Sequence, residues 1–220
     1  EGISRVTTPF GDFGAPHDLA AWGALLLGMG ILSVTLRRGL VEALVREHSR
    51  HLLVALLAVL AALLSWGYVV VYLRGGPRII DATSYFLEAR ALSEGHVAFR
   101  IPAPSAAFRG RFLLASPDGG ALSVIFPPGY PAVLALGFLS HAPMLVGPVI
   151  AALLVVVTYA LGLRLFGDAR IALLAAVLSV VCAVLRYHTA DTMSHGLAAL
   201  LLATSLWAAL GDGDRSAALS

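Results

Sequence analysis

The run LLVALLAVLAALLSWGYVVVYL, residues 52–73, constrains the fold most strongly, because it contains no charged side chain over a length that can cross a bilayer. A helix needs about 20 apolar residues to span the hydrocarbon core. The composition agrees, with 59% hydrophobic and only 13% charged residues, whereas about a quarter of the residues in soluble domains are charged. The sequence therefore predicts an integral membrane protein.

Charge-free windows and arginine-rich links predict the topology. The links RRGLVEALVREHSRH and RLFGDAR carry several arginines, which favours a cytoplasmic position for both. Because the span 52–73 leaves the cytoplasm, an odd number of crossings must then lie between its outer end and RLFGDAR. Residues 130–140, between prolines and His141, are too few to cross alone. We therefore expect an all-α, polytopic transmembrane helical bundle, with its N-terminus outside and spans at 19–36, 52–73, 144–163, 171–187 and 195–210.

The same map predicts an extracytoplasmic loop over residues 74–129 and an interfacial or re-entrant helix at 130–140. Long loops are exempt from the positive-inside count, so the arginines of this loop do not contradict the map. Asp81 and Asp191, although distant in sequence, are then expected on the same membrane face, each close to the mouth of a helix. This convergence is the strongest functional indication in the residue pattern.

The segment ATSYFLEARALSEGH predicts a short juxtamembrane helix that ends at Gly95. Tyr85 and Ala89 share one helical side, with Phe86 beside them, so that this side would face the headgroup layer. Asp81 would be the first residue or the N-cap of the helix, a position that acidic residues stabilise by about 1 kcal/mol. Capping alone is therefore an alternative to a chemical role, for Asp81 and equally for Asp191.

A second candidate site is local. His188, Asp191 and His195 would share a face if one helix ran through them, and imidazole and carboxylate groups can bind a divalent metal ion. The alternative is a polar interfacial edge without a metal. The sequence identifies no cofactor with certainty, and a divalent metal ion is the one candidate.

Several function classes find no support in the sequence. A net charge of +2 without a basic cluster does not indicate nucleic-acid binding. Cys182 is the only cysteine, so a disulfide framework or a thiolate metal site is not expected. The glycine-containing stretches RGGPR, SPDGG and GDGDR are typical of turns that do not follow strands. Because the chain begins without methionine and ends just after an apolar run, we expect it to be the N-terminal part of a longer protein, inactive alone.

The order of motifs resembles a known family. D-x-x-x-Y-F-x-x-A-R-x-L-x-x-G follows the span at 52–73, F-P-P-G-Y-P opens a short apolar helix, and R-L-F-G-D-x-R precedes an acid in the next outer loop. This arrangement, over roughly residues 52–210, resembles the N-terminal half of the GT-C glycosyltransferases, which include the protein O-mannosyltransferases and the lipid A aminoarabinose transferases.

The resemblance implies transfer of a sugar from a polyprenyl-phosphate donor, at the outer face of a bacterial plasma membrane, to an unknown acceptor that could be a glycan, lipid or protein. Asp81 matches the catalytic base of the family and Asp191 its second outer acid. Many relatives carry a second acid where this chain has Ala82, and some carry a charged residue where it has Phe126. These departures leave metal dependence and acceptor class open.

The chemistry of such a reaction suggests further residues. A carboxylate must take the proton of the acceptor hydroxyl, and guanidinium groups are suited to receive the charge that develops on a leaving phosphate. The outer candidates for phosphate binding are Arg78, Arg90, Arg100 and Arg186, although each could instead contact lipid headgroups.

Two other classes remain possible. A transporter would place polar groups near the bilayer midplane on broken helices, whereas the ionisable residues here cluster at one edge. A non-catalytic membrane scaffold predicts nothing that the sequence violates.

Overall fold

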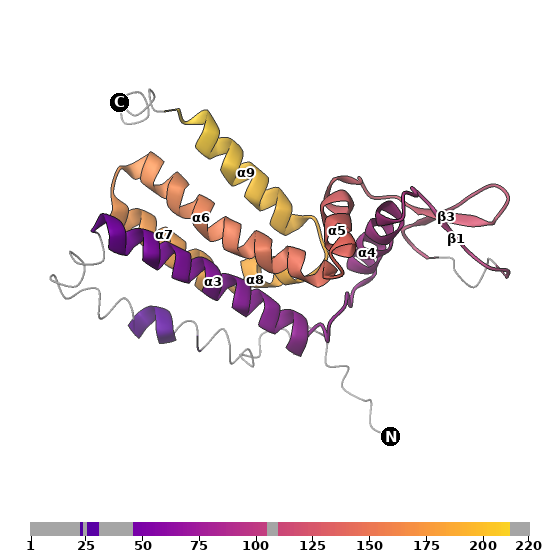
Figure 1. Ribbon diagram of the computed structural model, residues 1–220, viewed down its shortest axis with the longest axis horizontal. Helices are drawn as coiled ribbons and strands as arrows, with labels where there is room; N and C mark the ends of the chain where they lie inside the picture. The colour runs from indigo at the N-terminus through magenta and orange to yellow at the C-terminus, as the bar shows by residue number, and fades with distance from the viewer. Residues whose placement is uncertain (1–22, 24–25, 31–45, 105–109, 212–220) are drawn as a thin grey trace, which may run out of the picture.

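The computed structural model describes residues 23, 26–30, 46–104 and 110–211. The helices α3, α6, α7 and α9 lie lengthwise beside one another, with α6 packed against the other three, and the short α8 follows α7 after a bend of 60° (Figure 1). We call these five helices the bundle: α3 (Glu47–Val71), α6 (Val146–Phe166), α7 (Ala169–Val181), α8 (Ala183–Ala190) and α9 (His195–Ala209). Successive long helices run in opposite directions, so that α3 and α8 end, and α6 and α9 begin, at the same end of the bundle.

The sharp turn between α6 and α7 follows from two residues. Gly167 ends α6 in the left-handed conformation with φ of 65°, which costs glycine little because it has no Cβ. Asp168 then caps α7, because its side chain accepts a hydrogen bond from the backbone N–H of Arg170 at 2.8 Å. The link RLFGDAR is therefore a tight connection between two antiparallel helices.

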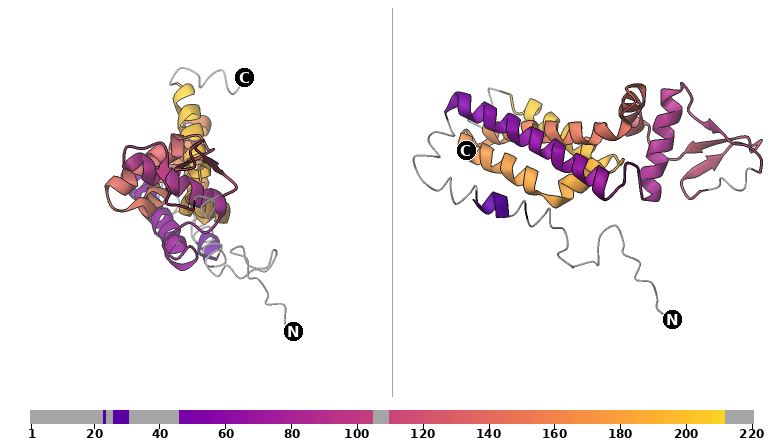
Figure 2. Two further views of the ribbon diagram at one scale, coloured as in Figure 1. Left: turned by 90° about the vertical axis from the view of Figure 1, so that its right-hand side faces the viewer. Right: turned by 60° about the horizontal axis from the view of Figure 1, so that its bottom comes forward.

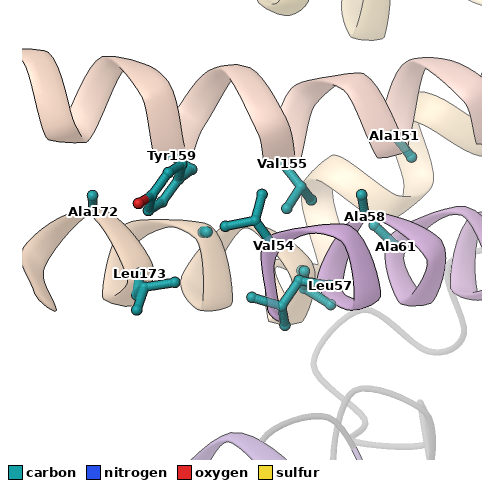
Figure 3. Close-up of a cluster of buried hydrophobic side chains, with 11 residues drawn as sticks. Val54, Leu57, Ala58, Ala61, Ala151, Val155, Tyr159, Ala172 and Leu173 are labelled. Atoms are coloured by element: carbon teal, nitrogen blue, oxygen red, sulfur yellow. The ribbon is translucent and has the colours of Figure 1, made fainter. Parts of the chain in front are cut away.

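Small residues let the helices approach closely in the core of the bundle. Ala58, Ala61, Ala151 and Ala172 lie among larger side chains where α3, α6 and α7 meet (Figure 3). Gly162 contacts α7 so closely that an added Cβ would lie 3.1 Å from the Cα of Ala172. Close backbone approach of this kind is how helices associate where surrounding lipid offers no hydrophobic driving force.

Two helical stretches in the described part of the chain are long and apolar enough to cross a membrane, Glu47–Val71 and Pro143–Phe166. They correspond to the expected spans 52–73 and 144–163. A third is possible if α7 and α8 count as one span, although they are bent by 60° at Cys182 rather than continuous over 171–187. The α9 helix occupies 195–210 but has only 15 residues. The expected span 19–36 lies largely outside the described residues.

A smaller part of the chain, which we call the end segment, stands across the end of the bundle (Figure 2). It contains α4 (Ile80–Ser93), α5 (Gly129–Leu139) and three strands, β1 (Phe99–Arg100), β2 (Leu113–Ala115) and β3 (Ala121–Val124). The strands form an antiparallel sheet in the order β1-β3-β2. The prediction of an all-α chain was wrong here, and SPDGG is a turn that does follow a strand, joining β2 to β3.

The helix expected after the first long span is confirmed as α4, and Gly95 follows it with φ of 80°. Its aromatic side is covered by protein rather than free to meet headgroups. Tyr85 and Ala89 are buried with Tyr130 and Leu134 of α5, and Tyr85 stacks on Phe126 with ring centroids 4.5 Å apart. The helix expected at 130–140 is α5, and its role in the fold is to hold α4 at the end of the bundle.

Candidate functional site

The first turn of α4 meets the turn between α8 and α9. The Thr192 hydroxyl donates a buried hydrogen bond of 2.9 Å to the backbone carbonyl of Ala82, and the Tyr85 and Ser194 hydroxyls lie 3.3 Å apart. Asp81 and Asp191 therefore come close enough to interact electrostatically. We call this region the acid joint and define it by Asp81, Ala82, Tyr187, Asp191 and Thr192. The expected convergence of the two acids at one end of the molecule is present in the structure.

Asp191 is deeply buried in the acid joint, with 2% of its surface exposed. Its carboxylate accepts a hydrogen bond from the Thr192 amide at 2.9 Å and another from the Tyr187 hydroxyl. Burial raises the pKa of the Asp191 carboxyl and the charge of Asp81 adds to this, while the two hydrogen bonds act in the opposite direction. A carboxyl held in this way can position its neighbours but cannot reach a bulky substrate.

Asp81 is only half-buried. It lies in the first turn of α4, whose N-cap Ile79 makes no side-chain capping hydrogen bond. Asp191 is the C-cap of α8, while Ser194 takes the N-cap position of α9. Neither acid is therefore the N-cap that the sequence suggested. The Asp81 side chain is partly accessible to solvent. It also lies at the positive end of the α4 dipole, which stabilises its negative charge.

The structure separates the four arginines that were expected to bind phosphate. Arg78 lies near Asp81, and its Nε donates a hydrogen bond of 3.2 Å to the Leu73 carbonyl. Arg90 lies nine residues beyond Asp81 on α4, which is about 13 Å of helix axis at 1.5 Å per residue. Arg100 lies in β1, on the sheet side of the end segment. Arg78, in the link just before α4, is therefore the arginine of this set that is nearest to Asp81 along the chain.

Arg186 is more deeply buried than expected. The residue was predicted at an outer mouth, but it is buried inside the bundle with 6% of its surface exposed. It lines a cavity of about 20 Å³ together with Ala61, Ala151 and Thr189, a space that holds about one water molecule. The bend at Cys182 causes this position, because it turns α8 inward against α3 and α6. Sequence reasoning from a straight span could not foresee it.

The proposed metal ligands are only partly brought together. The rings of His188 and His195 lie 4.6 Å apart by their centroids, whereas the carboxylate of Asp191 is engaged by Thr192 and Tyr187. Among residues 46–104 and 110–211, no three His, Cys, Asp or Glu side chains gather as a metal site requires. A divalent metal here stays a prediction.

Three residues of interest were missed by the sequence reasoning. Tyr187 lies four residues before Asp191, a spacing that places both on one helix face and could have indicated the contact. Tyr130 is buried and close enough to Asp191 to sense its charge, and nothing in the sequence indicates this long-range pairing. Glu88 is only 8% exposed, and its Oε2 finds no hydrogen-bond partner in the described structure.

Comparison of the chain with protein-family models, curated proteins and solved structures found no match.

Proposed function

We propose that this protein is a polytopic membrane glycosyltransferase of the GT-C type, which moves a sugar from a polyprenyl-phosphate donor to an acceptor at the outer face of a bacterial plasma membrane. The observation that carries the proposal is the acid joint, where a half-buried aspartate and a buried one meet at the end of the apolar bundle. A donor anchored in lipid would present its phosphate and sugar at this depth.

In this proposal Asp81 is the general base. Its carboxylate accepts the proton of the acceptor hydroxyl while that oxygen forms the new bond to the sugar carbon, and the lipid phosphate departs with the electrons of the broken bond. A positioned general base contributes about 10²- to 10⁴-fold to the rate. Arg78, three residues before Asp81, is suited to receive the charge on the phosphate.

Asp191 is then a positioning residue. Its hydrogen bonds with Thr192 and Tyr187 fix the turn between α8 and α9, and Thr192 in turn bonds to the backbone of α4 beside Asp81. Loss of the Asp191 carboxylate is expected to move Asp81 rather than to remove the base. Its effect on transfer should therefore be smaller than that of changing Asp81.

The test is transfer of radiolabelled sugar from polyprenyl-phosphate donors in membranes that contain the protein at its natural length. Asp81→Asn is expected to lower the rate by about 10²-fold or more with normal expression. Asp118→Asn is the matched control, because Asp118 is an exposed acid in the turn between β2 and β3. A rate for Asp81→Asn within twofold of the unaltered protein would exclude Asp81 as the base.

A transporter is the second candidate, favoured by one observation. The α7 and α8 pair is broken by 60°, and α8 carries the buried Arg186. Discontinuous helices with buried ionisable groups are typical of transport sites. In sealed vesicles a transporter would move the intact donor without releasing polyprenyl phosphate. Release of that product, lost in Asp81→Asn, would decide for the transferase.

A further inference from the structure

A cleft of about 730 Å³ opens at the other end of α4, on the side of the sheet. Its charged and titratable lining consists of Arg90 from the last turn of α4, Glu94 at the C-cap of that helix, His96 from the following link, and Arg100 from β1. We call it the basic cleft. Its volume is that of a small-molecule site, and none of its charged groups belongs to the acid joint.

The two arginines come from different elements and are both exposed at the cleft. Arg90 is held by an ion pair, with its Nε 3.3 Å from Glu94 Oε1, and the two side chains are 66% and 58% exposed. Exposed pairs of this kind contribute about 0–1 kcal/mol, so an incoming anion can displace Glu94 easily. The Glu94 carboxylate thus pairs with the Arg90 guanidinium group as a bound oxyanion would.

We infer that the basic cleft is a binding site for a phosphate-bearing ligand, separate from the acid joint. A single carboxylate, such as that of Glu94, can pair with one guanidinium group. Two arginines and a histidine around one cleft are suited to an anion that carries oxygens on several sides, as a phosphate does. The helix length between Arg90 and Asp81, about 13 Å, prevents one phosphate from touching both regions. This site is independent of the proposed transfer chemistry.

The position of the cleft favours a ligand that reaches it from water. The strands lie beyond α4, on the side of the end segment away from the bundle (Figures 1 and 2). A headgroup of an anionic lipid offers the same phosphate chemistry, but it would have to approach from the bundle side.

The test is calorimetric titration of the purified full chain with inorganic pyrophosphate at low ionic strength. Arg90→Gln and Arg100→Gln should each weaken binding about tenfold or more, since hydrogen bonds to charged groups are the strong ones. Glu94→Gln should strengthen binding roughly twofold to fivefold by removing the competing carboxylate. Arg111→Gln is the matched control, because Arg111 is exposed in the same end segment, lies over the Phe112 ring at 5.5 Å and does not line the cleft.

Opposite effects of the arginine and glutamate variants, with an unchanged control, would support the site. Equal affinity of the unaltered chain and both arginine variants would overturn it. The source of the phosphate is decided by repeating the titration in nanodiscs of zwitterionic lipid and in nanodiscs that also contain anionic lipid. Equal affinities in the two discs assign the cleft to a soluble phosphate, whereas competitive loss of pyrophosphate binding in anionic discs assigns it to a headgroup.

Discussion

At its first turn, α4 is packed against the turn between α8 and α9, and a buried hydrogen bond joins Thr192 to the Ala82 carbonyl. At its last turn the same helix is open to solvent, and its charged side chains, Arg90 and Glu94, are mostly exposed. The 14 residues of α4 thus connect a largely buried acidic region with a solvent-exposed basic one.

The difference teaches how the two sets of charges can act. A charged or polar group in a buried, closely packed region is held in position by its hydrogen-bond partners. Removing one partner leaves a buried group without a hydrogen bond and lowers stability. A charge in a solvent-exposed cleft gains little free energy when it forms an ion pair and loses little when the pair breaks. It therefore remains available to a ligand. We expect substitutions to cost most stability at the acid joint and least at the basic cleft.

The largest expected loss of stability is at the close approach beside the acid joint. A Cβ on Gly147 of α6 would lie 1.8 Å from the carbonyl oxygen of Thr189 in α8, and both groups belong to packed backbone. Gly147→Ala should lower the free energy of unfolding by about 2–3 kcal/mol or more, measured as a fall in the melting temperature in detergent.

Gly67→Ala is the matched control, because Gly67 is also a helical glycine but has nothing within 4 Å of an added Cβ. Alanine favours helix by up to about 1 kcal/mol over glycine, so this variant should be unchanged or slightly more stable. Equal melting temperatures for the two variants would contradict the close packing of α6 against α8.

The intermediate effect is expected at Glu88, midway along α4. Burial raises the pKa of the Glu88 carboxyl above its ordinary value of 4.5, so the folded protein holds the proton more tightly than the unfolded chain does. This contribution to stability is complete below pH 4.5 and is lost as the pH rises through the raised pKa. At neutral pH the buried carboxylate is therefore destabilising.

Glu88→Gln removes this titration. The variant should melt about 2 °C or more above the unaltered protein at pH 8, and the difference should vanish near pH 4. The exposed Glu94→Gln provides the control and should show no comparable pH dependence. A Glu88→Gln variant that is less stable at pH 8 than the unaltered protein would mean that the carboxylate is well paired in solution.

The smallest effect is expected at the basic cleft. A double-mutant cycle with Arg90→Gln and Glu94→Gln should give a coupling energy below about 1 kcal/mol from thermal or denaturant unfolding, because the pair is exposed and spaced i, i+4 on a helix. A coupling above about 2 kcal/mol would remove the contrast between the two ends of α4, since the cleft would then hold its charges as firmly as the acid joint does.

Most of the features that the sequence predicted follow from patterns within short stretches of the chain. Uninterrupted apolar length indicated the helices at 47–71 and 143–166, and Gly95 marked the end of α4. The meeting of Asp81 and Asp191 followed from counting crossings between arginine-rich links. These features depend on neighbours in sequence or on the parity of crossings, and both can be read without knowing side-chain contacts.

What could not be predicted depends on contacts between distant segments. The bend at Cys182 has no proline or glycine beside it to signal a break, and it changes Arg186 from an outer residue into a buried one. Glu88 is buried on α4, which packs against α5 and β3, segments distant from it in sequence. The strands are two to four residues long, which is too short for an alternating pattern to stand out from a loop.

The 15 residues of α9 have a consequence for the lipid around the protein. If the bundle spans a bilayer, a helix of this length covers about 22 Å, whereas the hydrocarbon core is about 30 Å thick. Such hydrophobic mismatch is relieved by local thinning of the bilayer. Because α9 begins just after Asp191, thinning there would bring the membrane surface toward the acid joint.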